Sequence, residues 1–280
     1  MKIRFGFDIV YTFAGPTPLT VLLHTHPSVA PRLCVPEELA VFPNVPVEPY
    51  LDAFGNQAHR MVAPAGEFRL TLDSMCTDSG ELDPYEPDAR QHPVDELPPE
   101  VLTYLLPSRY CEVDRLGPVA WSLFGHTPLG WKRVQAVVDW VHHHIRFDYQ
   151  QARSTRTALD GYHEAVGVCR DFTHLAVTLC RCLNIPARYT TGYLGDIGVP
   201  PVPDPMDFSA WFEVFLGGRW YPFDARHNAR RIGRIVMAYG RDAADVALTT
   251  TFGIHGLQQF TVWTDEVKAS ANTGALAVAC

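Results

Sequence analysis

The sequence predicts an α+β protein: a small N-terminal β domain, followed by a core of helices packed on an antiparallel sheet. Three observations support this prediction. Runs of β-branched and aromatic residues fill much of the first hundred positions, helical periodicity marks residues 131–183, and further strand-like runs follow residue 187. Helices followed by a group of strands, rather than a regular alternation of the two, are typical of the α+β class.

Two pairs of strands are expected in the β domain. Residues 2–12 and 17–24 are rich in Val, Ile, Phe, Tyr and Thr, and a turn at Ala14-Gly15-Pro16 separates them. Residues 57–64 and 67–75 have the same character and are expected to form a hairpin.

A linker is expected after this domain. Residues 83–99 are acidic and rich in proline, so they cannot continue as a helix or as a central strand. The chain is therefore expected to divide into a β domain over residues 1–98, a core over residues 99–265 and a short tail over residues 266–280.

The core is expected to contain at least two helices. Residues 131–145 and 169–183 place apolar side chains at helical spacing, and Asn184 and Pro186 end the second helix. Strand-like runs are expected to build its sheet, over residues 187–194, 207–216, 219–224, 233–239 and 257–263.

The composition is that of a globular protein, with 47% hydrophobic and 19% charged residues among 280. The 23 Lys and Arg residues against 31 Asp and Glu residues give a formal charge of -8 without a basic run, which argues against nucleic acid as a partner. The first residues lack the apolar region of a signal peptide, and no window has the ~18 apolar residues needed to cross a membrane. Seven scattered cysteines favour reduced thiols, so we expect a cytoplasmic protein.

Cys169 stands where the second helix is expected to begin. The free N–H groups and partial positive charge of a helix start favour a thiolate over a thiol, and they can also stabilise an oxyanion. Gly167 is expected to let a substrate approach the sulfur closely. These features make Cys169 a candidate nucleophile, although a small buried core residue is the alternative.

A hairpin is expected between two apolar runs that flank Gly217-Gly218. With these two glycines as the loop, Trp211 lies opposite Asp224 and one diagonal step separates Asp224 from Ser209. Asp224 is therefore placed either to orient a base near position 209 or to cap the turn that follows the strand. The face that carries these side chains is expected to border a site.

Together these segments resemble the transglutaminase-like superfamily, which shares the papain-like fold. The resemblance covers about residues 115–228 and rests on these fragments: Gly167-Val168-Cys169-Arg170-Asp171-Phe172, Asn184-Ile185-Pro186-Ala187-Arg188, Gly192-Tyr193, Ala210-Trp211-Phe212-Glu213-Val214, Trp220 and Asp224. It implies a Cys-His-Asp triad acting on peptide or protein amides by proteolysis, deamidation or transglutamination, with Cys169 as nucleophile and Asp224 as the acid that orients the histidine. The preceding β domain is similar to one that bacterial relatives carry.

The sequence departs from the family pattern at position 209, where Ser209 stands in place of the histidine. Serine is no general base near neutral pH, so three hypotheses remain. His227 serves as the base, if a bulge or turn redirects it from the face that strict alternation gives it. Alternatively, the helix start alone activates Cys169. In the third hypothesis the site has lost turnover and binds peptides, with Trp211, Trp220 and Tyr193 as the apolar wall of its cleft. No zinc, serine-elbow or phosphate-loop motif is present, so we expect chemistry without a metal or another cofactor. No feature indicates an oligomeric state.

Overall fold

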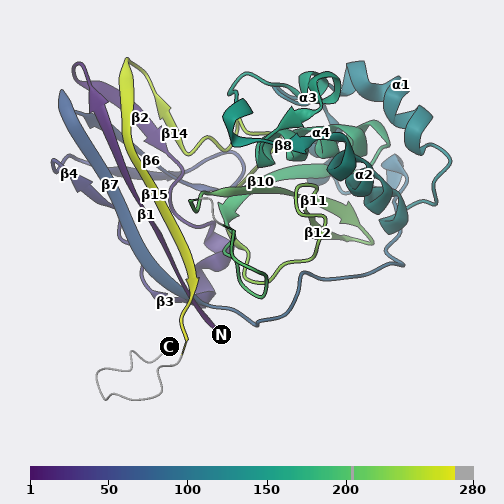
Figure 1. Ribbon diagram of the computed structural model, residues 1–280, viewed down its shortest axis with the longest axis horizontal. Helices are drawn as coiled ribbons and strands as arrows, with labels where there is room; N and C mark the ends of the chain where they lie inside the picture. The colour runs from purple at the N-terminus through teal and green to yellow at the C-terminus, as the bar shows by residue number, and fades with distance from the viewer. Residues whose placement is uncertain (203–204, 269–280) are drawn as a thin grey trace.

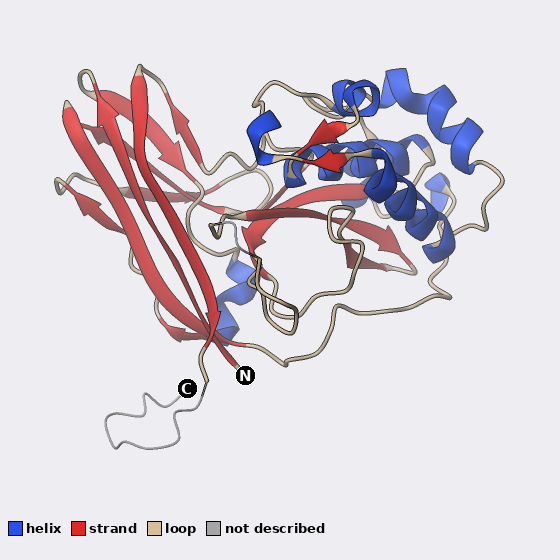
Figure 2. Cartoon of the chain, viewed as in Figure 1, coloured by secondary structure: helices blue, strands red, loops and turns tan. Residues whose placement is uncertain are grey.

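The computed structural model describes residues 1–202 and 205–268. A part built of strands lies beside a part in which helices cover a small sheet (Figures 1 and 2). The sequence prediction of an α+β fold, with a strand-rich N-terminal region, is confirmed.

Two antiparallel sheets form the strand-rich part. The first has the order β15-β1-β7-β3, with β4 also on β7; its strands are β1 (Lys2–Phe13), β3 (Leu33–Val35), β4 (Ala40–Phe42), β7 (Gly66–Thr77) and β15 (His255–Glu266). The second has the order β14-β2-β6-β5; its strands are β2 (Thr17–Val21), β5 (Glu48–Leu51), β6 (Gln57–Ala63) and β14 (Thr249–Thr251). The apolar side chains that alternate along β1 are fully buried in the core between them, as at Ile3, Phe5, Phe7 and Ile9.

The last two strands belong to these sheets and not to the sheet of the core. β14 pairs with β2, and β15 pairs with β1 along nearly its whole length, with Phe7 opposite Val262. This differs from the expected division, in which residues up to 265 formed the core. The alternation over residues 257–263 identifies a strand but not its partner, because the pairing spans about the whole chain. Of the expected tail, residues 269–280 lie outside the described residues.

The segment between β7 and the core has no α-helix or strand. It follows the surface with only two short 3₁₀ turns, η2 (Val94–Glu96) and η3 (Pro99–Leu105). Asp83 fastens it to the core, since its carboxylate accepts hydrogen bonds from the side chain of Arg234 and the backbone of Arg231.

The core consists of helices on an antiparallel sheet of order β12-β11-β10-β13. Its strands are β10 (Ala187–Tyr193), β11 (Ser209–Leu216), β12 (Arg219–Phe223) and β13 (Ile235–Gly240), and its helices are α1 (Val113–Phe124), α2 (Trp131–His144), α3 (Ala158–Glu164) and α4 (Cys169–Cys182). Helix α4 is buried from Asp171 to Cys182 and packs on the sheet face that carries Phe212 and Val214. A two-stranded parallel pair, β8 (Arg146–Phe147) and β9 (Val166–Gly167), leads the chain to Cys169.

Within the described residues, no helix has the length and apolar character needed to span a bilayer. Five cysteines are free thiols, namely Cys76, Cys111, Cys169, Cys180 and Cys182. Cys34, in contrast, is disulfide-bonded, which differs from the expectation that all thiols are reduced.

Candidate functional site

A buried carboxylate fixes the start of the helix that carries Cys169. The Asp171 side chain, which is fully buried, accepts a hydrogen bond of 2.9 Å from the backbone N–H of Val168. Arg156 donates to the same oxygen at 3.1 Å and is itself almost completely buried. An acid in the first turn satisfies a free N–H group and complements the helix dipole, so Cys169 has a defined position at the first residue of α4.

Gly167 has a different role from the one expected. A Cβ atom at this position would lie 2.5 Å from an Asp171 carboxylate oxygen and 2.6 Å from the Asp171 Cβ. Gly167 is buried and does not line the cavity beside Cys169. The absent side chain thus makes room for the carboxylate that holds the helix start, and not for an approaching substrate.

The sulfur of Cys169 faces the first residues of β11. The backbone N–H of Ala210 donates a hydrogen bond to it, and Cys169 packs on a small apolar cluster that includes Tyr189 and Ala210. The side chain is partly exposed to a cavity of about 630 Å³. The helix start therefore meets β11 on the face that carries Ala210 and Phe212, and not on the face of Trp211 that was expected to border the site.

The surroundings of the Cys169 thiol favour its protonated form. Burial raises the pKa of Cys169 to about 11, because the thiolate loses its hydration. The positive charge of Arg226 and the hydrogen bond from Ala210 lower the pKa, but Asp207 and Asp224 act against them. This differs from the expectation that the helix start favours the thiolate, so Cys169 needs a base to become a nucleophile.

The β11–β12 hairpin has the expected register, with Leu216 opposite Arg219 and Phe215 opposite Trp220. The last pair is Phe212 with Phe223, and Asp224 follows directly.

The buried Asp224 carboxylate accepts hydrogen bonds from the backbone N–H of His227 at 3.0 Å and from Arg234 Nη2 at 3.3 Å. Its second contact with His227 joins Oδ2 to ring atom Nδ1 at 2.9 Å. Burial alone raises the pKa of Asp224, yet the hydrogen bonds from His227 and the charge of Arg234 hold this pKa well below its usual range. Asp224 thus caps the following turn and also orients an imidazole, the two roles left open by the sequence.

A turn over residues 225–227 brings His227 back beside Asp224. His227 lines a second cavity, of about 260 Å³, together with Ser209 and Arg226. Ser209, in turn, lines the Cys169 cavity as well, as do Asp207 and Phe208. The thiol and the imidazole therefore border neighbouring cavities that share the segment 207–209.

The Ser209 side chain is buried, and its hydroxyl makes no hydrogen bond within the described part of the chain. Trp211, in contrast, is fully buried against Gly192 and the guanidinium of Arg234. It lines neither cavity, so the sequence expectation that it forms a wall of the cleft differs from the structure. The cause is that both faces of β11 are covered: opposite α4, Glu213 is paired with Arg188 at 2.9 Å.

Sequence reasoning missed Arg226 and Asp207. The Arg226 guanidinium lies 4.0 Å from the centre of the Phe147 ring, where its charge acts on Cys169. Burial raises the pKa of Asp207, and Arg226 opposes this effect. Their closeness in sequence to Asp224 and Ser209 is the signal that could have identified them.

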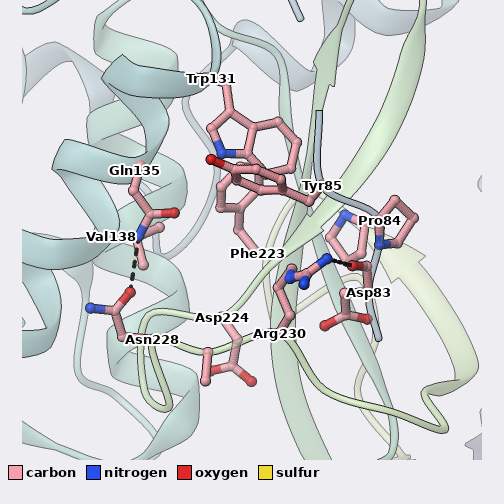
Figure 3. Close-up of a pocket in the computed structure, with 12 residues that line it drawn as sticks. Asp83, Pro84, Tyr85, Trp131, Gln135, Val138, Phe223, Asp224, Asn228 and Arg230 are labelled. Atoms are coloured by element: carbon pink, nitrogen blue, oxygen red, sulfur yellow. Dashed lines mark hydrogen bonds between the residues drawn. The ribbon is translucent and has the colours of Figure 1, made fainter. Parts of the chain in front are cut away.

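A third cavity, of about 160 Å³, lies on another side of Asp224. Figure 3 shows aromatic rings of Tyr85, Trp131 and Phe223 at one end and Asp224 at the other. Cys169 does not line it, so it is separate from the thiol. Across residues 1–202 and 205–268, no group of three or more His, Cys, Asp or Glu side chains is placed to hold a metal ion.

Comparisons with known proteins agree with this fold. Residues 123–225 match the family model of the transglutaminase-like superfamily. The crystal structure of a candidate cysteine protease from Cytophaga hutchinsonii is 29% identical and superposes with a TM-score of 0.83, covering 99% of this chain and 94% of that one. An uncharacterised protein from Mycobacterium leprae is 27% identical over 210 residues, and the match covers 71% of this chain and 73% of that protein. The predicted resemblance is thus confirmed: residues 123–225 match the core of the transglutaminase-like superfamily, and nearly the whole chain superposes on a candidate cysteine protease.

Proposed function

We propose that this protein is a thiol-dependent amide hydrolase or acyltransferase, with Cys169 as nucleophile and peptide or protein amides as substrates. In this proposal the catalytic imidazole is that of His227, in place of one at position 209. The contact between His227 Nδ1 and the buried Asp224 carboxylate, at 2.9 Å, carries the proposal. It has the form in which an acid fixes the tautomer and orientation of a catalytic base.

The Ser209 hydroxyl links the two halves of this site in the proposal. It borders both cavities and makes no hydrogen bond with another described residue. A hydroxyl both donates and accepts, so it can receive the thiol proton of Cys169 while passing its own proton to Nε2 of His227. The products of this transfer are a thiolate, an unchanged serine and an imidazolium that Asp224 stabilises.

The thiolate then attacks the amide carbonyl, which forms a C–S bond, and the C–N bond breaks as the leaving nitrogen takes the proton back from the imidazolium. Water or an amine resolves the resulting thioester and regenerates the thiol. The helix start alone explains turnover less well than His227 does, because burial keeps the pKa of Cys169 at about 11.

Turnover of a peptide mixture, followed by mass spectrometry, tests this assignment. Cleavage, deamidation or amine incorporation should vanish in Cys169→Ala and fall by about 10²–10⁴-fold in His227→Gln. His163→Gln is the matched control, since His163 is exposed on α3 and contacts neither cavity. Activity that survives in His227→Gln at the wild-type rate would overturn the assigned base.

Two substitutions test the serine. Ser209→Ala should reduce turnover as strongly as His227→Gln, because it removes the link. Ser209→His should raise turnover, because an imidazole beside the sulfur takes the proton in one step. If both variants behave as the wild type, the proton does not pass through position 209.

A peptide-binding module without turnover is the second candidate, favoured by Ser209 itself and by the protonated thiol. This second candidate would be established if the wild-type protein binds a peptide as tightly as Cys169→Ala does and releases no product from any amide. We also propose that the protein is bacterial, because the similar proteins come from Cytophaga hutchinsonii and Mycobacterium leprae, and that it is cytoplasmic, because five of its cysteines are free thiols. Fractionation of expressing cells tests the location, and recovery outside the cytoplasm would contradict it.

A further inference from the structure

The β domain supplies one wall of the Cys169 cavity. On the core side the cavity is bordered by Cys169, Ser209 and Tyr189. On the other side it is bordered by residues of three strands that precede or follow the core, Tyr11 of β1, Thr249 of β14, and Leu257 and Phe260 of β15. Its volume of about 630 Å³ is within the range of ligand-binding cavities.

Strand β15 lies at the edge of its sheet and pairs only with β1 among the described strands. Its other edge faces the core (Figure 1). Proteins usually protect a long edge strand with charged residues or proline, because its free N–H and C=O groups accept further strands. Residues 255–264 contain no Lys, Arg, Asp, Glu or Pro, so this edge has no such protection.

Two apolar side chains of β15 are left uncovered in the cavity. Leu257 is 55% exposed and Phe260 is 37% exposed. They share a face because the register with β1 skips Gln258, so that Gln259 is opposite Val10 and Leu257 opposite Tyr11. The Phe260 ring also contacts that of Phe208, at 5.7 Å between centroids, directly before Ser209 in the chain.

The cavity lies in the space between β15 and the core. Near one end of the strand the core closes on it, since a Cβ atom at Gly195 would lie 2.3 Å from the carbonyl oxygen of Thr264. Toward its first residues β15 lies farther from the core (Figure 1), and Leu257 in this part of the strand lines the cavity. A strand added to the free edge would thus run beside the thiol.

From these observations we infer that the free edge of β15 binds an extended peptide by strand addition, with a bulky apolar side chain against Leu257 and Phe260, and presents an amide of that peptide to Cys169. Backbone hydrogen bonds supply affinity and the apolar contact supplies selectivity. The reaction at Cys169 rests on the proposed function, whereas the binding does not. The substrate class is therefore unfolded or extended segments with an aromatic or branched aliphatic residue near the reacting amide.

Binding is measured on Cys169→Ala, which cannot react, by fluorescence anisotropy of labelled peptides. Peptides with Phe or Leu at the central position should bind at least about tenfold more tightly than those with Gly or Asp. Phe260→Lys should remove this preference. Phe42→Lys is the matched control, because Phe42 is 69% exposed on β4 of the same domain and lies outside the cavity.

Backbone pairing is tested on the ligand, which leaves the protein unchanged. Methylation of alternate peptide nitrogens should weaken binding about tenfold in one register and have little effect in the other, because a strand donates toward each side in turn. Equal affinity for both registers, or for Phe and Gly peptides, would overturn the inference. If peptides bind with the expected side-chain and register preferences but the wild type turns over no amide, the proposed function fails and this inference stands. If the wild type turns over amides without these preferences, the proposed function stands and this inference fails.

Discussion

Replacing Gly167 by alanine should destabilise the protein by about 2–4 kcal/mol. The added Cβ would lie 2.5 Å from an Asp171 oxygen, 2.6 Å from its Cβ and 2.9 Å from its Cγ, all closer than atoms of this kind approach. The carboxylate has little room to move, because it is fully buried and bonded to Val168 and Arg156. Overpacking costs about 1–3 kcal/mol, and a weakened helix cap adds about 1 kcal/mol.

Urea unfolding followed by circular dichroism measures this difference. Gly117→Ala is the control, since Gly117 lies in α1 and a Cβ there meets nothing within 4 Å. It should be neutral or stabilising by up to about 1 kcal/mol. If Gly167 instead served only for substrate approach, its alanine variant would unfold at the wild-type urea concentration and lose only turnover; that result would refute the packing explanation.

Three further predictions follow from the charges around the site. Iodoacetamide should alkylate Cys169 roughly 300-fold more slowly than a free thiol at pH 7.5, because the two pKa values are about 11 and about 8.5. The alkylation rate, measured by peptide mapping, should rise about tenfold per pH unit up to pH 10. A rate that reaches its plateau near pH 8.5 would contradict this prediction. Asp224 has a lowered pKa in the folded state, so its contribution to stability is full above pH ~4 and is lost as the pH falls below that; the difference in unfolding free energy between wild type and Asp224→Asn should therefore shrink below pH ~4, and a constant difference would show that the carboxylate is not held ionised. Arg156→Met leaves the buried Asp171 with Arg170 alone, at 3.7 Å, and should cost about 3–5 kcal/mol in urea unfolding, whereas a loss below about 1 kcal/mol would show that the pair adds little.

Local sequence signals predicted the features that depend on neighbours in the chain. The loop at Gly217-Gly218 fixes the hairpin register, and the apolar stripe of α4 fixes where Cys169 begins the helix. The helix cap was also within reach, because Asp171 is the third residue of α4 and a glycine precedes the cap.

Features that depend on distant segments could not be predicted. The polar positions of β11 suggested an open face, but Arg188 and Arg234 cover Glu213 and Trp211 there. The charge of Arg226 near the sulfur depends on the turn after β12, and the pairing of β15 depends on a strand at the other end of the described chain. The alternation of apolar and polar residues identifies a strand, but it does not show which other strand pairs with it.

The pairing of β1 with β15 has a consequence for biosynthesis. A ribosome releases the helix with Cys169 many residues before it makes residues 255–266. Until then the nascent chain has a thiol but no wall of Leu257 and Phe260 beside it. The same order protects the cell from truncated products, because a chain that stops before β15 lacks the strand on which we expect a peptide to dock.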